Sequence, residues 1–295
     1  WFHSQRILFI NDPDHICCRT KPDWGKTLLS NVSLTGGMMM LSDPIAAYDE
    51  QRIYNVQRCM PPLETFAAET GPLEIDHQAY AWTKLHGALF TGEIEMGWHE
   101  VPEEDAVVIS GEHPTMDHEH PFGSLWATHF ATGAGTWCVA QRVANLPLPA
   151  SRISVEKLGL DPAKTYLTFD FWAGAFLGEV RGTMDVPALE LGYGQVLAFR
   201  ERLDHPRFLA STRHVSMGAV GICGEAWDAD GTLTLEVQGV AGAEETYWFH
   251  CPEGWSSVDA FLDEQPVTAG LEGELFSCAL AASPSGSVLR LRFAC

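Results

Sequence analysis

Residues 9–19, FINDPDHICCR, lead an apolar run directly into Asn-Asp-Pro-Asp, and residues 38–44, MMMLSDP, repeat the arrangement with Ser-Asp-Pro. The apolar residues 7–10 and 38–41 are short and end in turn-forming residues, which is typical of buried strands. Pro13 biases Asp12 toward an extended backbone, so the first strand is not expected to continue into a helix. The chain therefore opens with two predicted strands, each ending in acidic residues.

Two helices are predicted to follow these strands. The first begins at Asp23, a suitable N-cap, and ends at the Gly-Gly pair of residues 36–37. Trp24, Leu28 and Val32 recur at four-residue spacing and are predicted to form its apolar face.

The second helix is predicted to begin at Asp43 as N-cap, with Pro44 at the first position, and to end at the Pro-Pro pair of residues 61–62. Its predicted apolar face consists of Ile45, Tyr48, Ile53, Val56 and Met60. Alternation of strand and helix predicts parallel strands covered by helices. Two such strands are too few for a complete sheet, so this part either packs on something outside the chain or is the tail of a longer domain.

The alternation of predicted strands and helices ends at Pro62. Residues 63–104 are irregular, and from about Ala106 the chain is a series of short strand-like runs separated by Gly, Pro, Asp and Asn. The clearest runs are residues 124–131, 136–143, 166–172, 194–200, 232–240, 246–251 and 287–293. This spacing predicts one or two antiparallel β-sandwiches, with a seam near residues 212–221.

The overall charge limits the classes of partner. The net charge is −21 and the pI is about 4.8, so the surface repels phosphate backbones and anionic lipid. We therefore expect neither a nucleic-acid nor a membrane partner. A neutral ligand such as a sugar is compatible with an acidic surface.

The eight cysteines form no C-x-x-C pair and no regular framework. Cys17 and Cys18 are adjacent, which is poor geometry for a disulfide between them. Scattered cysteines in a chain of this length are interpreted as buried or idle thiols.

The ends of the two predicted strands carry the candidate functional residues. Asn11, Asp12 and Asp14 follow the first strand, and Ser42 and Asp43 follow the second. In α/β barrels reactive groups lie where strands end, and a carboxylate there accepts hydrogen bonds from sugar hydroxyls. Asp and Asn side chains also cap turns, and the pattern taken alone favours this purely structural role.

Two segments of the sequence resemble a known family. RILFINDPDHICCR followed by LSNVSLTGGMMMLSDPIAAYDEQRI resembles the end of the catalytic barrel in α-galactosidases and related glycoside hydrolases, the melibiase-like families of clan D. YLTFDFWAGAFLGEVRG and LDHPRFLASTRHVSMGAV look like the C-terminal β-domain of bacterial members. The two matches occur in the expected order.

The resemblance implies a domain layout. Residues 1–62 would be the C-terminal part of a (β/α)8 catalytic barrel, and residues 63–104 a connecting segment. Residues 105–212 would form a β-sandwich, and residues 213–295 a second sandwich or a continuation of the first. The first residue is Trp1 rather than Met, and we expect the chain to begin inside a longer product.

The resemblance also implies retaining hydrolysis of α-linked galactosides or related sugars, with no cofactor. The family's nucleophile and acid/base are Asp residues on earlier strand ends, so they are expected to have no counterpart in this chain. Asp14 would line the sugar subsite, with Asn11, Asp12 and His15 around it. Eukaryotic relatives commonly carry Met where His15 stands, and a polar ring there would change which sugar substituent is tolerated.

Other groups of polar and aromatic residues are interpreted as structural rather than functional. His113, Asp117, His118 and His120 would suit a metal if they lay on a strand, but a polar surface loop is favoured and no metal is predicted. The tryptophans of the β region are interpreted mainly as core residues rather than a sugar platform: Trp126, Trp137, Trp172, Trp227, Trp248 and Trp255. Asp170 is expected to be solvent-facing or hydrogen-bonded, and Arg213-His214 lacks a nucleophile elbow.

The leading hypothesis is thus an α-galactosidase-like glycoside hydrolase with a carbohydrate substrate. The alternative is a non-catalytic carbohydrate-binding or scaffolding chain that completes a barrel with a partner. A homo-oligomer is compatible with either.

Overall fold

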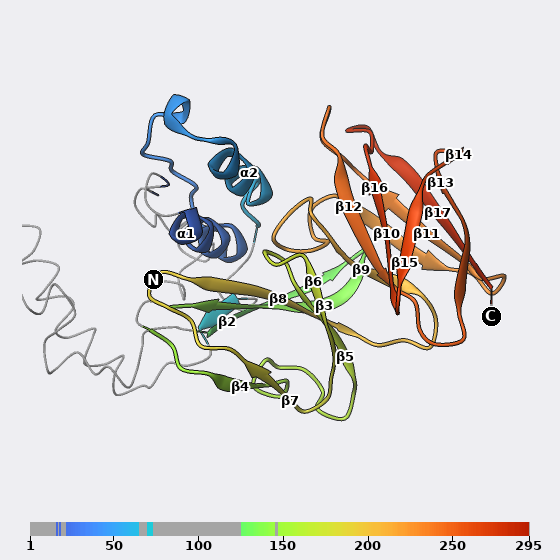
Figure 1. The fold of residues 1–295 in the computed structure, drawn as a ribbon, viewed down its shortest axis with the longest axis horizontal. Helices are drawn as coiled ribbons and strands as arrows, with labels where there is room; N and C mark the ends of the chain where they lie inside the picture. The colour runs from blue at the N-terminus through green and yellow to red at the C-terminus, as the bar shows by residue number, and fades with distance from the viewer. Residues whose placement is uncertain are drawn as a thin grey trace, which may run out of the picture.

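The computed structural model describes residues 16, 18, 22–64, 70–72, 125–144 and 147–294. A small helical part lies beside a six-stranded sheet. A five-stranded and a four-stranded sheet lie at the far end (Figure 1). None of the helices in these ranges combines the length and apolarity needed to cross a bilayer.

The first helix, α1 (Pro22–Thr35), has its predicted C-terminal stop. Gly36 adopts φ +73°, Gly37 N–H donates to Val32 O at 3.0 Å, and Gly36 N–H donates to Ser33 O at 3.3 Å. This is a Schellman ending, which needs a residue tolerant of positive φ at position 36. The predicted N-cap is wrong, because Asp23 lies inside the first turn, where it pairs with Lys26.

The predicted second helix is divided into two elements. A 3-10 turn, η2 (Ile45–Ala47), precedes α2 (Glu50–Arg58). The N-cap of α2 is Asp49, whose carboxylate accepts the Arg52 N–H at 2.9 Å, so the prediction that Asp43 caps this helix is wrong.

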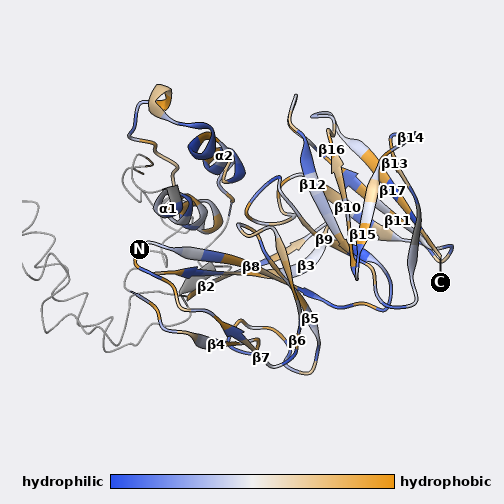
Figure 2. Cartoon of the chain, in the orientation of Figure 1, coloured by the Kyte–Doolittle hydropathy of each residue, from blue (hydrophilic) through white to orange (hydrophobic). Residues whose placement is uncertain are grey.

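The predicted apolar faces of the two helices are also partly wrong. Leu29 is fully buried and Val32 nearly so, but Leu28 is 47% exposed. Figure 2 shows α2 as mostly hydrophilic along its length. Several of the residues expected to face a core are instead exposed: Ile45, Ile53 and Met60. Local spacing placed these side chains on one face but could not determine what that face packs against.

One parallel bridge joins the segment after the first predicted strand to the second predicted strand. Ile16 N–H donates to Met40 O at 2.7 Å and Ser42 N–H donates to Ile16 O at 3.2 Å, which makes a parallel bridge between Ile16 and Leu41. The predicted strand at residues 7–10 lies outside the described residues. Residues 38–41 contain only the bridge at Leu41, so the (β/α)8 barrel remains a prediction.

The central sheet has six antiparallel strands in the order β1-β2-β3-β8-β5-β6. These strands are β1 (Thr70–Pro72), β2 (Leu125–Thr132), β3 (Gly135–Val143), β8 (Gly194–Glu201), β5 (Tyr166–Asp170) and β6 (Ala175–Val180). One face packs on the two-stranded sheet of β4 (Ser151–Ser154) and β7 (Thr183–Val186), around a core that includes Ile153, Leu197 and Phe199. The six-stranded and two-stranded sheets form the first pair of sheets. The opposite face belongs to a second core that also contains Leu29 of α1.

A second pair of antiparallel sheets follows. The five-stranded sheet has the order β10-β11-β17-β13-β14, and the four-stranded sheet has the order β15-β16-β12-β9. Their strands are β9 (Arg207–Ser211), β10 (Ile222–Trp227), β11 (Thr232–Val237), β12 (Glu245–His250), β13 (Ser256–Leu262), β14 (Gln265–Pro266), β15 (Ala269–Glu272), β16 (Leu275–Leu280) and β17 (Ser287–Ala294). Alternating residues such as Leu235, Phe249 and Leu291 fill the space between them.

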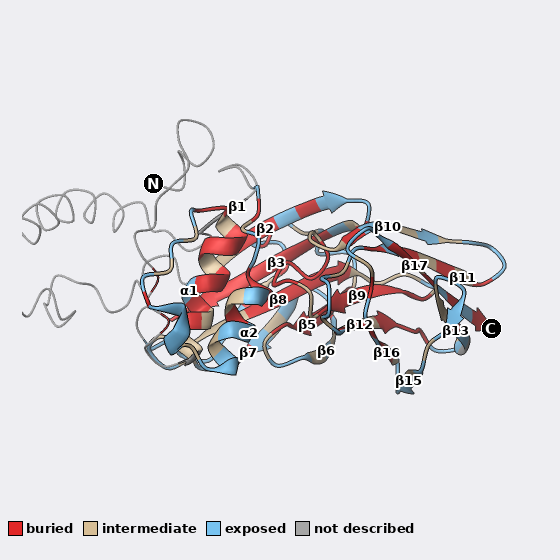
Figure 3. Cartoon of the chain, turned by 90° about the horizontal axis from the view of Figure 1, so that it is seen from above, coloured by how far each residue is buried: buried red, intermediate tan, exposed pale blue. Residues whose placement is uncertain are grey.

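The antiparallel β content is therefore confirmed, and each strand-like run named from the sequence overlaps an observed strand. The chain passes between the two pairs of sheets from β8 to β9, ahead of the seam expected at residues 212–221. The domain boundaries themselves remain a prediction. One buried core nevertheless runs from α1 through β3 and β8 into the second pair of sheets (Figure 3).

Candidate functional site

The residues predicted to bind a sugar lie outside the described residues: Asn11, Asp12, Asp14 and His15. The histidine-rich loop with His113, Asp117, His118 and His120 does as well. The described residues that adjoin the predicted sugar site are Ile16 and Cys18. They lie beside Leu41 and Asp43, respectively, so the two strand-end segments are neighbours.

Asp43 holds these segments together. Its side chain is buried, and its Oδ2 accepts the Cys18 N–H at 2.6 Å and the Tyr48 hydroxyl at 3.3 Å. Burial, with Cys18 and Asp43 nearby, raises the pKa of Tyr48 well above its usual value, so its hydroxyl remains a donor. Arg52 also reaches this corner, because its Nε donates to Cys18 O at 2.7 Å. Asp43 thus tethers one strand end to the other.

His214 links the helical part to the β part. Its Nε2 lies 3.0 Å from Pro61 O and 3.0 Å from Ser33 Oγ, and its Nδ1 lies 3.1 Å from the Ser216 N. A carbonyl oxygen only accepts, so Nε2 carries the proton and Nδ1 accepts from Ser216. Burial, with Arg213 adjacent, lowers the pKa of His214 to about 3. The ring is therefore a neutral structural connector, which agrees with the absence of a nucleophile elbow noted in the sequence.

A buried charge cluster lies beside this connector. Arg58 and Arg213 approach Glu245 Oε1 at 3.7 and 3.6 Å, and the Tyr247 hydroxyl donates to Glu245 Oε2 at 3.1 Å. The pKa of Glu245 is raised, because the effect of burial outweighs the lowering by Tyr247 and the two arginines. Arg58 Nη1 also donates to Thr212 O at 2.9 Å, so the cluster fastens α2 to the β part.

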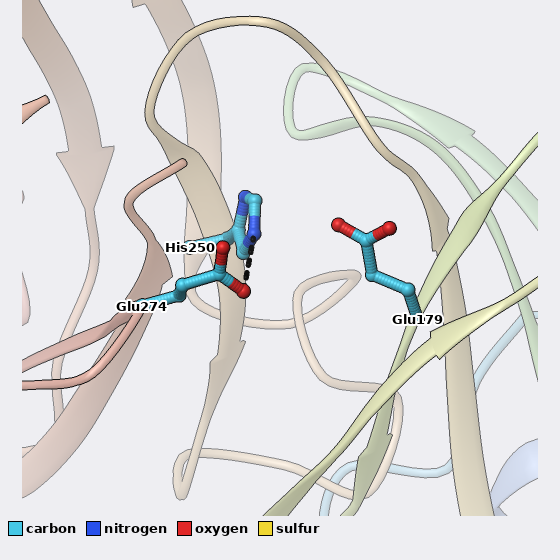
Figure 4. Close-up of side chains that lie close together, drawn as sticks. All are labelled: Glu179, His250 and Glu274. Atoms are coloured by element: carbon cyan, nitrogen blue, oxygen red, sulfur yellow. Dashed lines mark ion pairs between the residues drawn. The ribbon is translucent and has the colours of Figure 1, made fainter. Parts of the chain in front are cut away.

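Glu179, His250 and Glu274 form the one group in the described ranges whose ligand atoms suit a metal ion. Glu179 lies in β6, His250 ends β12, and Glu274 directly precedes β16. One ligand atom from each lies within 4.8 Å of the others, and the three side chains converge from two strands and a turn (Figure 4). Sequence reasoning missed this group, since the residues are far apart in the chain and share no spacing.

His250 is the buried member of this group. Its side chain is 0% exposed, whereas the side chains of Glu179 and Glu274 are 37% and 45% exposed. Burial, with Arg202 nearby, lowers the pKa of His250 to about 4. Neither ring nitrogen has a hydrogen-bond partner within the described structure. The His250 Nε2 to Glu274 Oε2 distance of 3.9 Å is too long for a hydrogen bond.

The tryptophans largely behave as core residues. Trp137 is buried, and four others pack partly buried against the same core: Trp172, Trp227, Trp248 and Trp255. Trp227 stacks on His205 with ring centroids 4.7 Å apart, and Trp255 Nε1 donates to Asp204 O at 2.9 Å. The stacking covers one face of the Trp227 ring, and the hydrogen bond uses the polar edge of the Trp255 ring.

Asp170 and the thiols also follow expectation. Asp170 is buried and hydrogen-bonded, accepting from Gln195 Nε2 at 3.0 Å and from the Ala173 N–H at 3.2 Å. All of the described cysteines except Cys223 are buried. Burial raises the pKa of Cys138 to about 12, which leaves its thiol unreactive.

No protein-family model matches the chain, and neither does any curated protein. Among solved structures, the chain is similar to a GH27 β-L-arabinopyranosidase from Geobacillus stearothermophilus in complex with arabinose. The two are 10% identical over 66% of this chain and 38% of that chain, with a TM-score of 0.39.

The chain is also similar to α-galactosidase I from Mortierella vinacea: 7% identity, 64% of this chain and 39% of that chain, TM-score 0.35. A third similar structure is an isomalto-dextranase from Arthrobacter globiformis T6 complexed with panose. It is 13% identical over 95% of this chain and 47% of that chain, with a TM-score of 0.38. The chain thus spans less than half the length of each of these glycosidases.

Proposed function

We propose that this chain belongs to a retaining glycoside hydrolase of the α-galactosidase type, acting on α-linked galactosides or related sugars. The proposal rests first on the sequence resemblance, in which residues 6–19 and 29–53 match the end of a catalytic barrel. Residues 166–182 and 203–220 match the following β-domain in the same order.

The single structural observation that supports the proposal is the parallel bridge between Ile16 and Leu41. Parallel strands joined through a helix are the repeating unit of an α/β barrel, and α1 (Pro22–Thr35) lies between these two residues in the chain. Ile16 closely follows Asn-Asp-Pro-Asp-His, and Leu41 precedes Ser42 and Asp43. The bridge brings together the segments that the family resemblance assigns to adjacent strand ends.

The proposed chemistry divides between binding and bond cleavage. Asp14 accepts hydrogen bonds from sugar hydroxyls, with Asn11, Asp12 and His15 around it. The bond-cleaving carboxylates of retaining enzymes lie about 5–5.5 Å apart, one as nucleophile and one as acid/base. The resemblance assigns both to strand ends that have no counterpart in these residues, so this chain supplies the sugar subsite rather than the reacting pair.

The test is the turnover of a panel of aryl α-glycosides, with the α-galactoside first. It is applied both to this chain and to the longest product that its gene encodes. We expect turnover only by the longer product, and galactose binding by both. Clear turnover by these 295 residues alone would show that the sequence has been mapped onto the wrong part of the family. Galactose binding without turnover by the longer product would support the non-catalytic alternative, and no binding by either would overturn both hypotheses.

A further inference from the structure

The cluster of Glu179, His250 and Glu274 lies where the two pairs of sheets meet. Glu179 comes from β6, an edge strand of the six-stranded sheet. His250 ends β12 and Glu274 follows β15 in the four-stranded sheet. In Figure 4 the Glu274 carboxylate lies next to the His250 ring, with one ring nitrogen toward it, and the Glu179 carboxylate points toward them from the other side. Any ligand held by all three side chains would connect the two pairs of sheets directly.

The imidazole of His250 has an unmet requirement. Its ring is fully buried, yet neither nitrogen has a hydrogen-bond partner among the described residues. A buried polar group without a partner is costly and is rare in native proteins. Phe176, whose ring centroid is 6.1 Å from that of His250, offers only an apolar neighbour. A ligand at Nε2, the nitrogen nearer Glu274, would satisfy one of the two nitrogens and remove part of this cost.

The charges around the ring are mixed. Arg202 pairs with Oε1 of Glu179, which leaves the other oxygen of that carboxylate for a second partner. Carboxylates that bind a metal are typically hydrogen-bonded by a further group, and Arg202 would supply that bond here. Arg202 and Arg207 both add positive charge near His250, although Arg207 also lies 3.9 Å from Glu225. Attraction of a cation therefore depends on both Glu179 and Glu274.

We propose that Glu179, His250 and Glu274 bind one divalent transition-metal ion, Zn²⁺ by preference, which fastens the two pairs of sheets together. One imidazole nitrogen with two carboxylate oxygens suits Zn²⁺ better than Ca²⁺ or Mg²⁺, which favour oxygen ligands throughout. This site has no role in the proposed sugar chemistry and does not depend on it.

Modest side-chain movement completes the site. Zinc lies about 2.0–2.2 Å from nitrogen and oxygen ligands, so its ligand atoms lie roughly 3.3–3.6 Å apart. The present separations reach 4.8 Å, so the carboxylates must move inward by about 1 Å. Both glutamates are substantially exposed and have the freedom to do so, while the buried ring stays fixed. Their exposure also leaves room for water at the remaining coordination positions.

The test begins with protein stripped by a chelator and dialysed, titrated with Zn²⁺ by calorimetry and followed by thermal melting. We expect one equivalent to bind and the melting temperature to rise, because a ligand that binds only the folded state stabilises it. Co²⁺ in place of Zn²⁺ should give visible absorption bands from a nitrogen- and oxygen-ligated ion. Absence of saturable Zn²⁺ binding by the parent protein would overturn the proposal.

Variants assign the binding to this cluster. Glu274→Gln and Glu179→Gln should each weaken Zn²⁺ binding at least about tenfold and reduce the melting shift. Both side chains are exposed, so these variants should fold even if His250→Gln does not. Glu272→Gln, two residues from Glu274 and also exposed, is the matched control and should bind like the parent. If Glu274→Gln and Glu179→Gln bind as tightly as this control, the ion lies elsewhere and the proposal is wrong.

Discussion

The Nε2 atom of His214 lies 3.0 Å from the hydroxyl oxygen of Ser33, although the two residues are 181 positions apart in the chain. Ser33 belongs to α1, and His214 lies just past β9 in the second pair of sheets. The same nitrogen contacts Pro61 O, so one buried ring joins α1, the segment after α2 and the β part. The other ring nitrogen, Nδ1, accepts the Ser216 N–H, which requires a neutral imidazole and makes the folded state sensitive to acid.

The first prediction concerns this acid sensitivity. The pKa of His214 falls from 6.5 to about 3 on folding. Between these two pH values the imidazole is protonated in the unfolded chain but neutral in the folded protein. Stability is therefore retained above pH 6.5 and is lost as pH falls toward 3. The expected contribution of this residue is a loss of about 2 kcal/mol between pH 6.5 and 5.

Urea unfolding of the parent and of His214→Gln from neutral pH down to about pH 5 measures this contribution. The variant should be less stable at neutral pH, because it loses bonds to Ser33 or Ser216, but its stability should fall less steeply with acid. All other titrating groups are common to both proteins. Parallel pH curves for the two would show that His214 is not held neutral.

The second prediction concerns Arg200, whose guanidinium is completely buried. It donates to Leu209 O, Ala134 O and Met217 O, each at 2.9 Å, and its centre lies 4.1 Å from the Trp137 ring. Burial lowers the pKa of Arg200 to about 9, so it remains charged at neutral pH. Arg200→Met leaves three buried carbonyls without donors and should destabilise the protein by about 3 kcal/mol or more.

Thermal and urea unfolding provide the measurement for Arg200→Met. Arg200→Lys should also be strongly destabilised, since an ammonium group lacks the planar fork that reaches three carbonyls. Arg152→Met is the control, because Arg152 pairs with Asp185 in solvent and its loss should leave the melting temperature unchanged. A melting temperature for Arg200→Met equal to that of the control would contradict the prediction.

The third prediction concerns the contact between Gly192 and Trp24. Gly192 has φ +83°, and a Cβ added there would lie 2.0 Å from Trp24 Nε1. Gly192→Ala must therefore displace the indole that docks α1 and strain the backbone as well, with an expected cost of about 3 kcal/mol.

The matched control for Gly192→Ala is Gly174→Ala. Gly174 also has a positive φ, +60°, but nothing lies within 4 Å of the position that an alanine methyl group would occupy. It should therefore show only the backbone cost of about 1 kcal/mol. Shortening the indole in Gly192→Ala/Trp24→Leu should recover part of the loss, as expected for residues in contact. Equal losses from the two alanine substitutions would rule out the clash.

The fourth prediction concerns the proposed sugar subsite. Asp14→Ala should weaken galactose binding about tenfold or more, because a hydrogen bond to a charged group contributes about 1.5–3 kcal/mol to the binding free energy. The melting temperature of the protein should not change. Calorimetry with galactose provides the measurement. Asp259→Asn, an exposed change in β13 at the far end of the molecule, is the control and should bind galactose normally. Unchanged affinity in Asp14→Ala would remove this residue from the site.

Local structure was largely readable from the sequence. Strand alternation and turn residues predicted β2, β3, β8 and β12 within a residue or two, since side-chain period and Gly or Pro positions act over a few residues. The Gly36-Gly37 stop of α1 was predicted for the same reason. The order of strand and helix predicted parallel strands at the start of the chain, and that pairing of residues 7–10 with residues 38–41 stays a prediction.

Tertiary structure decided what those elements bury and which side chains meet. Leu28 and Ile53 are exposed although their spacing suggested a core face, because a helix buries whichever face its neighbours cover. Pairing of β12 with β9 and β16, distant along the chain, brings His250 to Glu274 and, across the sheets, to Glu179. Such convergence arises from long-range strand pairing and packing, so no local pattern records it. The sequence by itself largely determined whether a segment forms a helix, a strand or a turn. The packing of the core determined which other segments each one contacts.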